Sequence, residues 1–339
     1  MNIKSILKYL IPLVLAIVLL FYAFKNVDLS EFIAKASEVN YMWVIASIAL
    51  SLISHWLRAY RWNILLSPFG YELKSGRTFL AVMTGYLANL AFPRIGEVTR
   101  CGVLKKNDGV PMSLSFGTVI TERIIDFFIL LSLILLDFIL EFEKVFGFFS
   151  ETLGFDQLFQ NKIFIAIGIV AFIIMSLISF FLAKRFISIE SENAFFNKIR
   201  TILREMMNGL FSLKKIKNVY GFVFSTVGIW VLYYLMSYII VFSIAETSEL
   251  GILAGLSILV AGGIAMAIPV QGGIGTYHAF ITGILLLYGI KQSTGLFFAT
   301  LLHASQIFSI LFFGGICVLI SVFVSKNKSS NSQENANGK

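Results

Sequence analysis

The stretch Asn89–Arg100, with the sequence NLAFPRIGEVTR, decides how the rest of the chain is interpreted. It places a proline, a glycine and three charges inside an otherwise apolar protein. A second stretch, Ile268–Ala279 with the sequence IPVQGGIGTYHA, has the same character. Both interrupt helical patterns, and in lipid every backbone polar group without a hydrogen bond costs several kcal/mol. Because such breaks are tolerated where they line a site, these two stretches are the first candidates for one.

The composition identifies a membrane protein. Of the 339 residues 58% are hydrophobic and 14% are charged, and the apolar residues form long uninterrupted runs. The net charge of +8 could suggest a nucleic-acid partner. However, the basic residues lie between apolar runs, as the positive-inside rule predicts for cytoplasmic loops, so we expect no nucleic-acid binding. Cys101 and Cys317 lie far apart and show no metal-ligand spacing, so we expect no disulfide framework, metal or cofactor.

The order of apolar runs predicts an all-α polytopic membrane protein with about six full spans and two re-entrant helical hairpins. The predicted spans are residues 9–24, 41–67, 113–140, 163–183, 220–245 and 296–324, and the hairpins pair 78–92 with 94–105 and 251–268 with 276–289. The first pair has basic residues at both ends, which also fits two full spans, so charge alone leaves both interpretations open. We expect one transmembrane domain over residues 1–325 and a disordered cytoplasmic tail over 326–339.

The basic segments predict the orientation. Lys4 and Lys8 place the N-terminus on the inner side, Arg58 and Arg61 mark where the second span emerges there, and both termini are expected in the cytoplasm of a bacterium. A short interfacial helix is predicted over 28–39, and a basic amphipathic helix within 184–217 is either an elbow between spans or a sensor of anionic lipid.

The two halves, about 8–140 and 160–325, contain the same order of elements with opposite topology. This order is typical of inverted-repeat transporters, whose sites form at paired broken helices. It makes a spatial prediction, which is that Pro93 and Pro269 approach each other near the midplane.

The first break offers positive charge. Pro93 suits the first turn of a new helix, so we expect a half-helix to start at Arg94. Arg94, Glu97 and Arg100 then share one face, and two arginines around one glutamate favour an anionic headgroup. The alternative is a salt-bridged loop at the cytoplasmic surface.

The second break offers backbone groups. Gly272, Gly273 and Gly275 permit a positive φ, and Thr276 can cap the following helix, which together would cradle an anion. Alternatively, the glycines only let the hairpin turn. His278 could relay protons, although a lone histidine near a helix start is more often a packing residue.

The segment TERIID, residues 121–126, is the third candidate. Glu122 and Asp126 share a helix face and Arg123 lies beside them, which predicts an intramembrane charge cluster. Each such charge costs about 3 kcal/mol on insertion scales, so it is generally paired or functional. The alternative is a structural clamp to Arg94 or Arg100. Weaker candidates are His55, Asp137 and His303.

Enzymatic signatures do not occur in the sequence: it lacks an HExxH motif, a P-loop and a nucleophile elbow. We therefore expect no catalytic residues and a protein that is not an enzyme.

Together, the three motifs resemble, in order and spacing, those of the flippase-like family, also called the lysylphosphatidylglycerol synthase transmembrane-region family. The resemblance covers about residues 8–325. The matching residues are Asn89, Pro93, Arg94, Gly96, Glu97, Arg100, Glu122, Arg123, Asp126, Pro269, Gly272, Gly273 and Gly275. Many members have glutamate where His278 stands. The sequence shows no counterpart of the aminoacyl-transfer domain of fused synthases, so we do not expect it to make aminoacylated lipid.

The resemblance implies a lipid translocase of the bacterial inner membrane that moves an anionic phospholipid or a polyprenyl-phosphate-linked lipid. Its lipid-binding residues would be Asn89, Arg94, Arg100, Arg123, Gly272, Gly273, Gly275 and Thr276, and charge balance or proton coupling would fall to Glu97, Glu122, Asp126 and His278. Further expected partners are a second copy of the chain or a separate lipid-modifying enzyme. The alternatives are a membrane glycosyl- or lipid-transfer enzyme or its accessory subunit, and a scaffold subunit.

Overall fold

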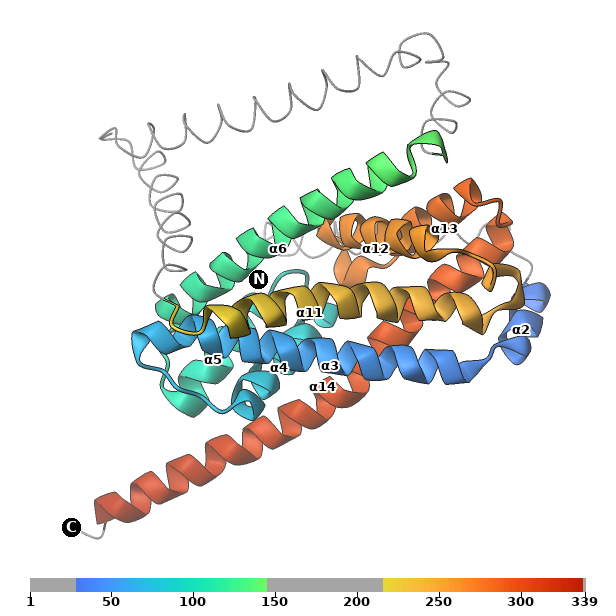
Figure 1. Cartoon of the computed structure of the whole chain (residues 1–339). Helices are drawn as coiled ribbons and strands as arrows, with labels where there is room; N and C mark the ends of the chain where they lie inside the picture. Colours follow the sequence, from blue (N-terminus) through green and yellow to red (C-terminus); the bar gives the residue numbers. More distant parts are fainter. Residues whose placement is uncertain (1–28, 145–215, 338–339) are drawn as a thin grey trace, which may run out of the picture.

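The computed structural model describes residues 29–144 and 216–337, and in these ranges the chain forms helices and no strand (Figure 1). Three of the described segments are long and apolar enough to cross a membrane: Tyr41–Phe69, Val219–Ser243 and Gln292–Phe323. The expected all-α membrane architecture is therefore confirmed for the described part. The spans predicted at 9–24 and 163–183 and the basic helix predicted within 184–217 lie outside it.

An antiparallel pair of helices, α3 (Tyr41–Leu66) and α11 (Val219–Tyr238), forms the centre of the bundle (Figure 1). At one end the Asn40 amide donates to the Ser243 carbonyl at 2.9 Å. At the other end the Asn218 side chain donates to the Tyr60 hydroxyl at 3.2 Å. The helices approach closely at Gly228, where a Cβ would lie 2.9 Å from Leu57 Cδ1.

The first broken segment folds as a helical hairpin of α4 (Ser75–Ala91) and α5 (Gly96–Asp108). The two backbones touch where Gly85 meets Gly96, since a Cβ on Gly96 would lie 2.2 Å from the Gly85 carbonyl oxygen. The Gly96 amide donates to Asn89 Oδ1 at 2.6 Å, so a side chain of α4 satisfies the first amide of α5.

The second broken segment is also a hairpin, made by α12 (Ile252–Ala267), the short η5 (Gln271–Gly273) and α13 (Thr276–Leu287). It packs on α14 (Gln292–Asn337) through a buried apolar cluster that includes Ile258, Ile281 and Phe298. Helix α14 continues through most of the polar tail, where the sequence predicts disorder, and this extension projects beyond the bundle in Figure 1.

The remaining described helices close the bundle around these units. Helix α6 (Met112–Leu140) contacts α3, α5 and α12 (Figure 1). The short helix predicted over 28–39 is present as α2 (Leu29–Glu38). It is tied to η4 (Ala245–Thr247) by an ion pair between Lys35 and Glu246, and this hydrogen bond lowers the pKa of the Glu246 carboxyl.

Candidate functional site

The two broken segments meet each other, although their contacting residues are 173 to 181 positions apart in the sequence. Gln271 Nε2 donates to the carbonyls of Leu90 at 3.2 Å and Ala91 at 2.9 Å. In the opposite direction, Arg94 Nη2 donates to the Ala267 carbonyl at 3.3 Å. These contacts flank Pro93 and Pro269, so the breaks approach each other, and their position near the midplane stays a prediction.

The first break differs in detail from the prediction. Helix α5 begins at Gly96 with Ile95 as its N-cap, and not at Arg94. The reason is the bond from the Gly96 amide to Asn89, which fixes the helix start, while the chain before it makes a turn from the Phe92 carbonyl to the Ile95 amide. Within this turn Arg94 has a φ of 62°, a left-handed conformation that is uncommon for a residue other than glycine. Its side chain is exposed.

The second break uses its glycines as predicted, since Gly272, Gly273 and Gly275 have φ values of 58°, 73° and 85°. The expectation that Thr276 caps α13 is wrong, because Gly275 occupies the N-cap position. The Thr276 hydroxyl instead donates to the Gly273 carbonyl at 3.0 Å and the Ala265 carbonyl at 3.3 Å, so it ties the break to α12.

Two histidines lie directly beside this glycine turn. His303 on α14 places Nε2 2.9 Å from the Gly272 carbonyl and stacks on Tyr277 with ring centroids 4.6 Å apart. The His278 ring lies 5.3 Å from that of His303, and its Nδ1 accepts the Gly275 amide at 3.4 Å. His278 is therefore engaged with the start of its own helix, and a role in proton relay stays a prediction.

The predicted charge cluster of α6 is buried and ion-paired with α3 and α5. Asp126 receives Arg58 and Arg61, one on each carboxylate oxygen, both at 2.9 Å. Glu122 receives Arg100 at 2.7 Å and Arg61 Nε at 3.5 Å. The alternative of a structural clamp to Arg100 thus describes part of this cluster.

The expectation that Arg58 and Arg61 mark the surface is wrong. Their residues are only 3% and 0% exposed, because the carboxylates of α6 face them across the bundle. A sequence signal existed: Arg58 and Arg61 are three apart on one helix face, and Glu122 and Asp126 are four apart on another, so the two faces are complementary. The span predicted over 41–67 is longer than the hydrocarbon core, so its basic end was expected to emerge from the membrane.

The buried cluster carries one excess positive charge, because three guanidinium groups (Arg58, Arg61, Arg100) face two carboxylates. Arg61 Nη1 and Arg100 Nε have no hydrogen-bond partner among the described residues, although both side chains are almost fully buried. A buried charge without full compensation is costly. The Arg100 guanidinium also lies over the Trp62 ring, 4.6 Å from its centroid, which offsets part of that cost.

Beside the buried cluster lie the two arginines that remain accessible. Arg123 is 44% exposed in its side chain and pairs with Glu97 at 3.3 Å. Arg94 is exposed in the first break. The predicted unit of Arg94, Glu97 and Arg100 is therefore divided: Glu97 pairs with Arg123, and Arg100 pairs with Glu122.

Outside this region, the weaker candidates make local contacts. His55 Nε2 lies 3.2 Å from the Ser51 hydroxyl, and its ring packs on Tyr86. Asp137 accepts the Ser257 hydroxyl at 2.8 Å. No cluster of three or more metal-ligating side chains occurs in residues 29–144 and 216–337.

This fold defines a membrane protein with transmembrane helices and a buried arginine–carboxylate cluster beside two helix breaks. The family described as "Lysylphosphatidylglycerol synthase TM region" matches this chain over residues 9–314. The chain therefore belongs to this family. It is also 28% identical over 151 residues to the UPF0104 membrane protein of Methanocaldococcus jannaschii. That match covers 44% of each chain, so the aligned part spans less than half of the curated relative. No solved structure matches the chain.

Proposed function

We propose that this protein translocates a lipid with an anionic headgroup across the bacterial cytoplasmic membrane, and that the headgroup is held beside the junction of the two breaks. The observation that carries the proposal is the arginine-rich cluster, in which three guanidinium groups share two carboxylates and leave buried N–H groups without partners. A phosphate would supply the missing charge and acceptors. The name of the family, which refers to a synthase of a phospholipid, supports a lipid as the bearer of that phosphate.

The proposed topology has about six full spans and two re-entrant hairpins arranged as inverted repeats. It is supported by helix length. The 16 residues of α12 and the 12 of α13 reach about 24 and 18 Å at 1.5 Å per residue, whereas the hydrocarbon core is about 30 Å thick. Both hairpins would therefore turn inside the membrane, where their breaks contact each other.

In the proposed mechanism, the exposed Arg94 and Arg123 meet the headgroup first. A phosphate can compete with Glu97 for Arg123 because that pair is partly exposed and its separation is 3.3 Å. Arg100 and Arg61 lie deeper and stabilise the phosphate through their free N–H groups. The lipid tails stay in the bilayer. Glu97, Glu122, Asp126 and His278 would balance charge or carry a coupling proton.

The test is lipid translocation in proteoliposomes with fluorescent phosphatidylglycerol, whose outer-leaflet fraction is bleached by dithionite. The variant combines Arg94→Gly with Arg123→Gln. Glycine keeps the left-handed backbone at position 94, so only the side chain is lost. A charge-assisted hydrogen bond contributes about 1.5–3 kcal/mol, so translocation is expected to slow at least about tenfold.

The matched control is Lys106→Gln, which removes an exposed positive charge from the last turn of α5 and should leave the rate unchanged. Wild-type protein that moves no labelled lipid, or a double variant as fast as the control, would refute the proposal. So would a protein that chemically modifies the lipid in place of moving it, since we propose that the chain is not an enzyme.

A further inference from the structure

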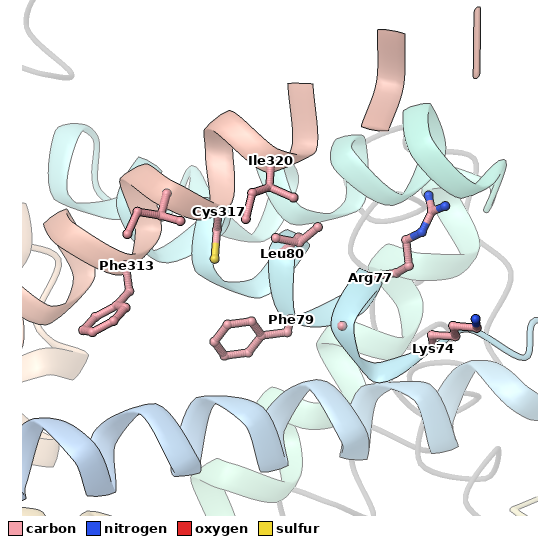
Figure 2. A pocket seen from close by; sticks show the side chains of 9 residues that line it. Lys74, Arg77, Phe79, Leu80, Phe313, Cys317 and Ile320 are labelled. Carbon is pink, nitrogen blue, oxygen red and sulfur yellow. The ribbon is translucent and has the colours of Figure 1, made fainter. Parts of the chain in front are cut away.

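A second feature lies away from the charge cluster, in a groove between α4 and α14. The groove has a volume of about 490 Å³, within the range of ligand sites. Most of its wall is apolar and includes Phe79, Phe313, Ile316 and Ile320. Figure 2 shows Phe313, Cys317 and Ile320 on one side, with Lys74 and Arg77 at the opposite end.

The groove ends where α14 packs closely against α4. There α14 touches α4 at Gly314, where a Cβ would lie 3.2 Å from Leu87 Cβ and 3.3 Å from the Met83 carbonyl oxygen. Beyond this contact the groove is lined by Leu80 of α4 and Ile320 of α14. Lys74 and Ala91 stand at the two ends of α4, so the basic end of the groove is about 26 Å along the helix from the break.

The surroundings indicate what occupies the groove. Ile316 and Ile320 are 41% and 44% exposed, and their neighbours Leu319 and Phe323 are more exposed still. Such an apolar rim on a membrane-spanning helix faces hydrocarbon and not water. The apolar wall therefore suits an acyl chain.

The polar end fits an anion. Lys74 is exposed and makes no ion pair within the part of the chain described. Arg77 forms an ion pair with Asp108 at 3.3 Å, and 42% of its side chain stays exposed. Two cations at the end of an apolar groove are complementary to a phosphate attached to acyl chains.

We propose that this groove binds an anionic phospholipid, with one acyl chain along α14 and the phosphate against Lys74 and Arg77. This lipid occupies a site separate from the headgroup site at the breaks. It stays bound between α4 and α14 and holds the first hairpin against the last helix. The proposal does not depend on translocation.

The test uses phosphatidylglycerol that carries a diazirine in its acyl chain, added to nanodiscs of phosphatidylcholine. After illumination, cross-linked peptides of α14 are quantified by mass spectrometry. We expect labelling around Phe313–Ile320 to exceed that by the matching phosphatidylcholine probe. One basic residue at an anionic surface contributes about fivefold in affinity, so Lys74→Gln should lower this labelling by about that factor.

Two further variants separate occupancy from charge. Gly76 lines the groove and has open space where a Cβ would stand, so Gly76→Leu should fill its end and reduce labelling while both charges remain. Gly76→Ala is the size control, and Lys106→Gln is the charge control outside the groove. The unfolding temperature of each variant checks that it folds.

Equal labelling by the two lipid probes, or equal effects of Lys74→Gln and Lys106→Gln, would overturn the proposal, because the segment would then contact only bulk lipid. The Arg94→Gly, Arg123→Gln variant should label normally in the groove. Loss of translocation and loss of groove binding can therefore be distinguished.

Discussion

At the scale of residues, two buried carboxylates of helix α6 pair with the buried arginines of the cluster. Asp126 and Glu122 hold three arginines from two other helices, and a fourth arginine, Arg123, turns outward from between them. The two carboxylates thus keep Arg58, Arg61 and Arg100 inside the bundle at tolerable cost. The excess charge that remains is the property available for binding an anion.

Replacing Asp126 by asparagine should strongly destabilise the protein. The change keeps the shape but leaves Arg58 without a carboxylate partner and Arg61 with Glu122 alone at 3.5 Å. Uncompensated buried charges cost about 3–5 kcal/mol. The expected result is a clearly lower unfolding temperature in detergent. Glu143→Gln, at an exposed acidic residue beyond the end of α6, is the control and should change little.

A companion double variant tests the cause of that loss. Combining Arg58→Met with Asp126→Leu removes both partners of one pair, so it should be less destabilised than Asp126→Asn despite being the larger change. If Asp126→Asn unfolds at the wild-type temperature, the ion pairs of the cluster carry no net stabilisation and this account is wrong.

The sequence revealed only part of this cluster. The residue types in TERIID predicted a paired charge cluster, and its two carboxylates are buried and ion-paired, because charges inside an apolar run are rare enough to stand out. Arg58 and Arg61 did not stand out in the same way, since they lie near the end of an apolar run, where basic residues usually mark the membrane boundary. Only the packing of α3 against α6 shows that they are buried.

At the scale of elements, the first hairpin depends on close backbone contact. Gly85 on α4 faces Gly96 on α5, and Asn89 on α4 bonds the first amide of α5. Except for the C-terminal end of α14, the positions of the described helices were predictable from the apolar runs to within a few residues. The helix start at Gly96 was not, because a side chain seven residues earlier determines it and no local capping rule includes such a partner.

Gly85→Ala should weaken this hairpin. A Cβ at position 85 would lie 2.7 Å from the Gly96 carbonyl oxygen and 3.2 Å from Arg100 Cβ, so the helices must separate, at a cost of about 1–3 kcal/mol. The measurement is the unfolding temperature in detergent. Translocation should fall as well, because the displacement carries Arg100 away from Glu122.

Gly102→Ala is the matched control on the same hairpin. Gly102 lies inside α5 and has nothing within 4 Å of a Cβ, so alanine should be neutral or stabilise the helix by up to about 1 kcal/mol. If both variants have the same stability, backbone contact at Gly85 does not hold the hairpin together.

At the scale of the whole molecule, the central helix pair of α3 and α11 determines which loops lie at opposite ends of the bundle. Helix α3 is 26 residues long, about 39 Å, and its start at Asn40 is bonded to Ser243 at the end of η3 (Ile239–Ser243). The loop that contains Glu249 therefore lies at one end of α3, and the loop that contains Glu72 lies at the other. The proposed inverted repeat places the Glu249 loop outside the cell and the Glu72 loop in the cytoplasm.

Single cysteines test this arrangement. In a background with Cys101→Ser and Cys317→Ser, Glu72→Cys and Glu249→Cys each introduce one thiol at an exposed position. In intact cells a membrane-impermeant maleimide should label Glu249→Cys, and it should label Glu72→Cys only after the membrane is permeabilised. The physical reason is the length of α3, which exceeds the roughly 30 Å hydrocarbon core. Labelling of both thiols from the same side would show that α3 does not cross the membrane, and the inverted topology with its site between two opposed hairpins would have to be abandoned.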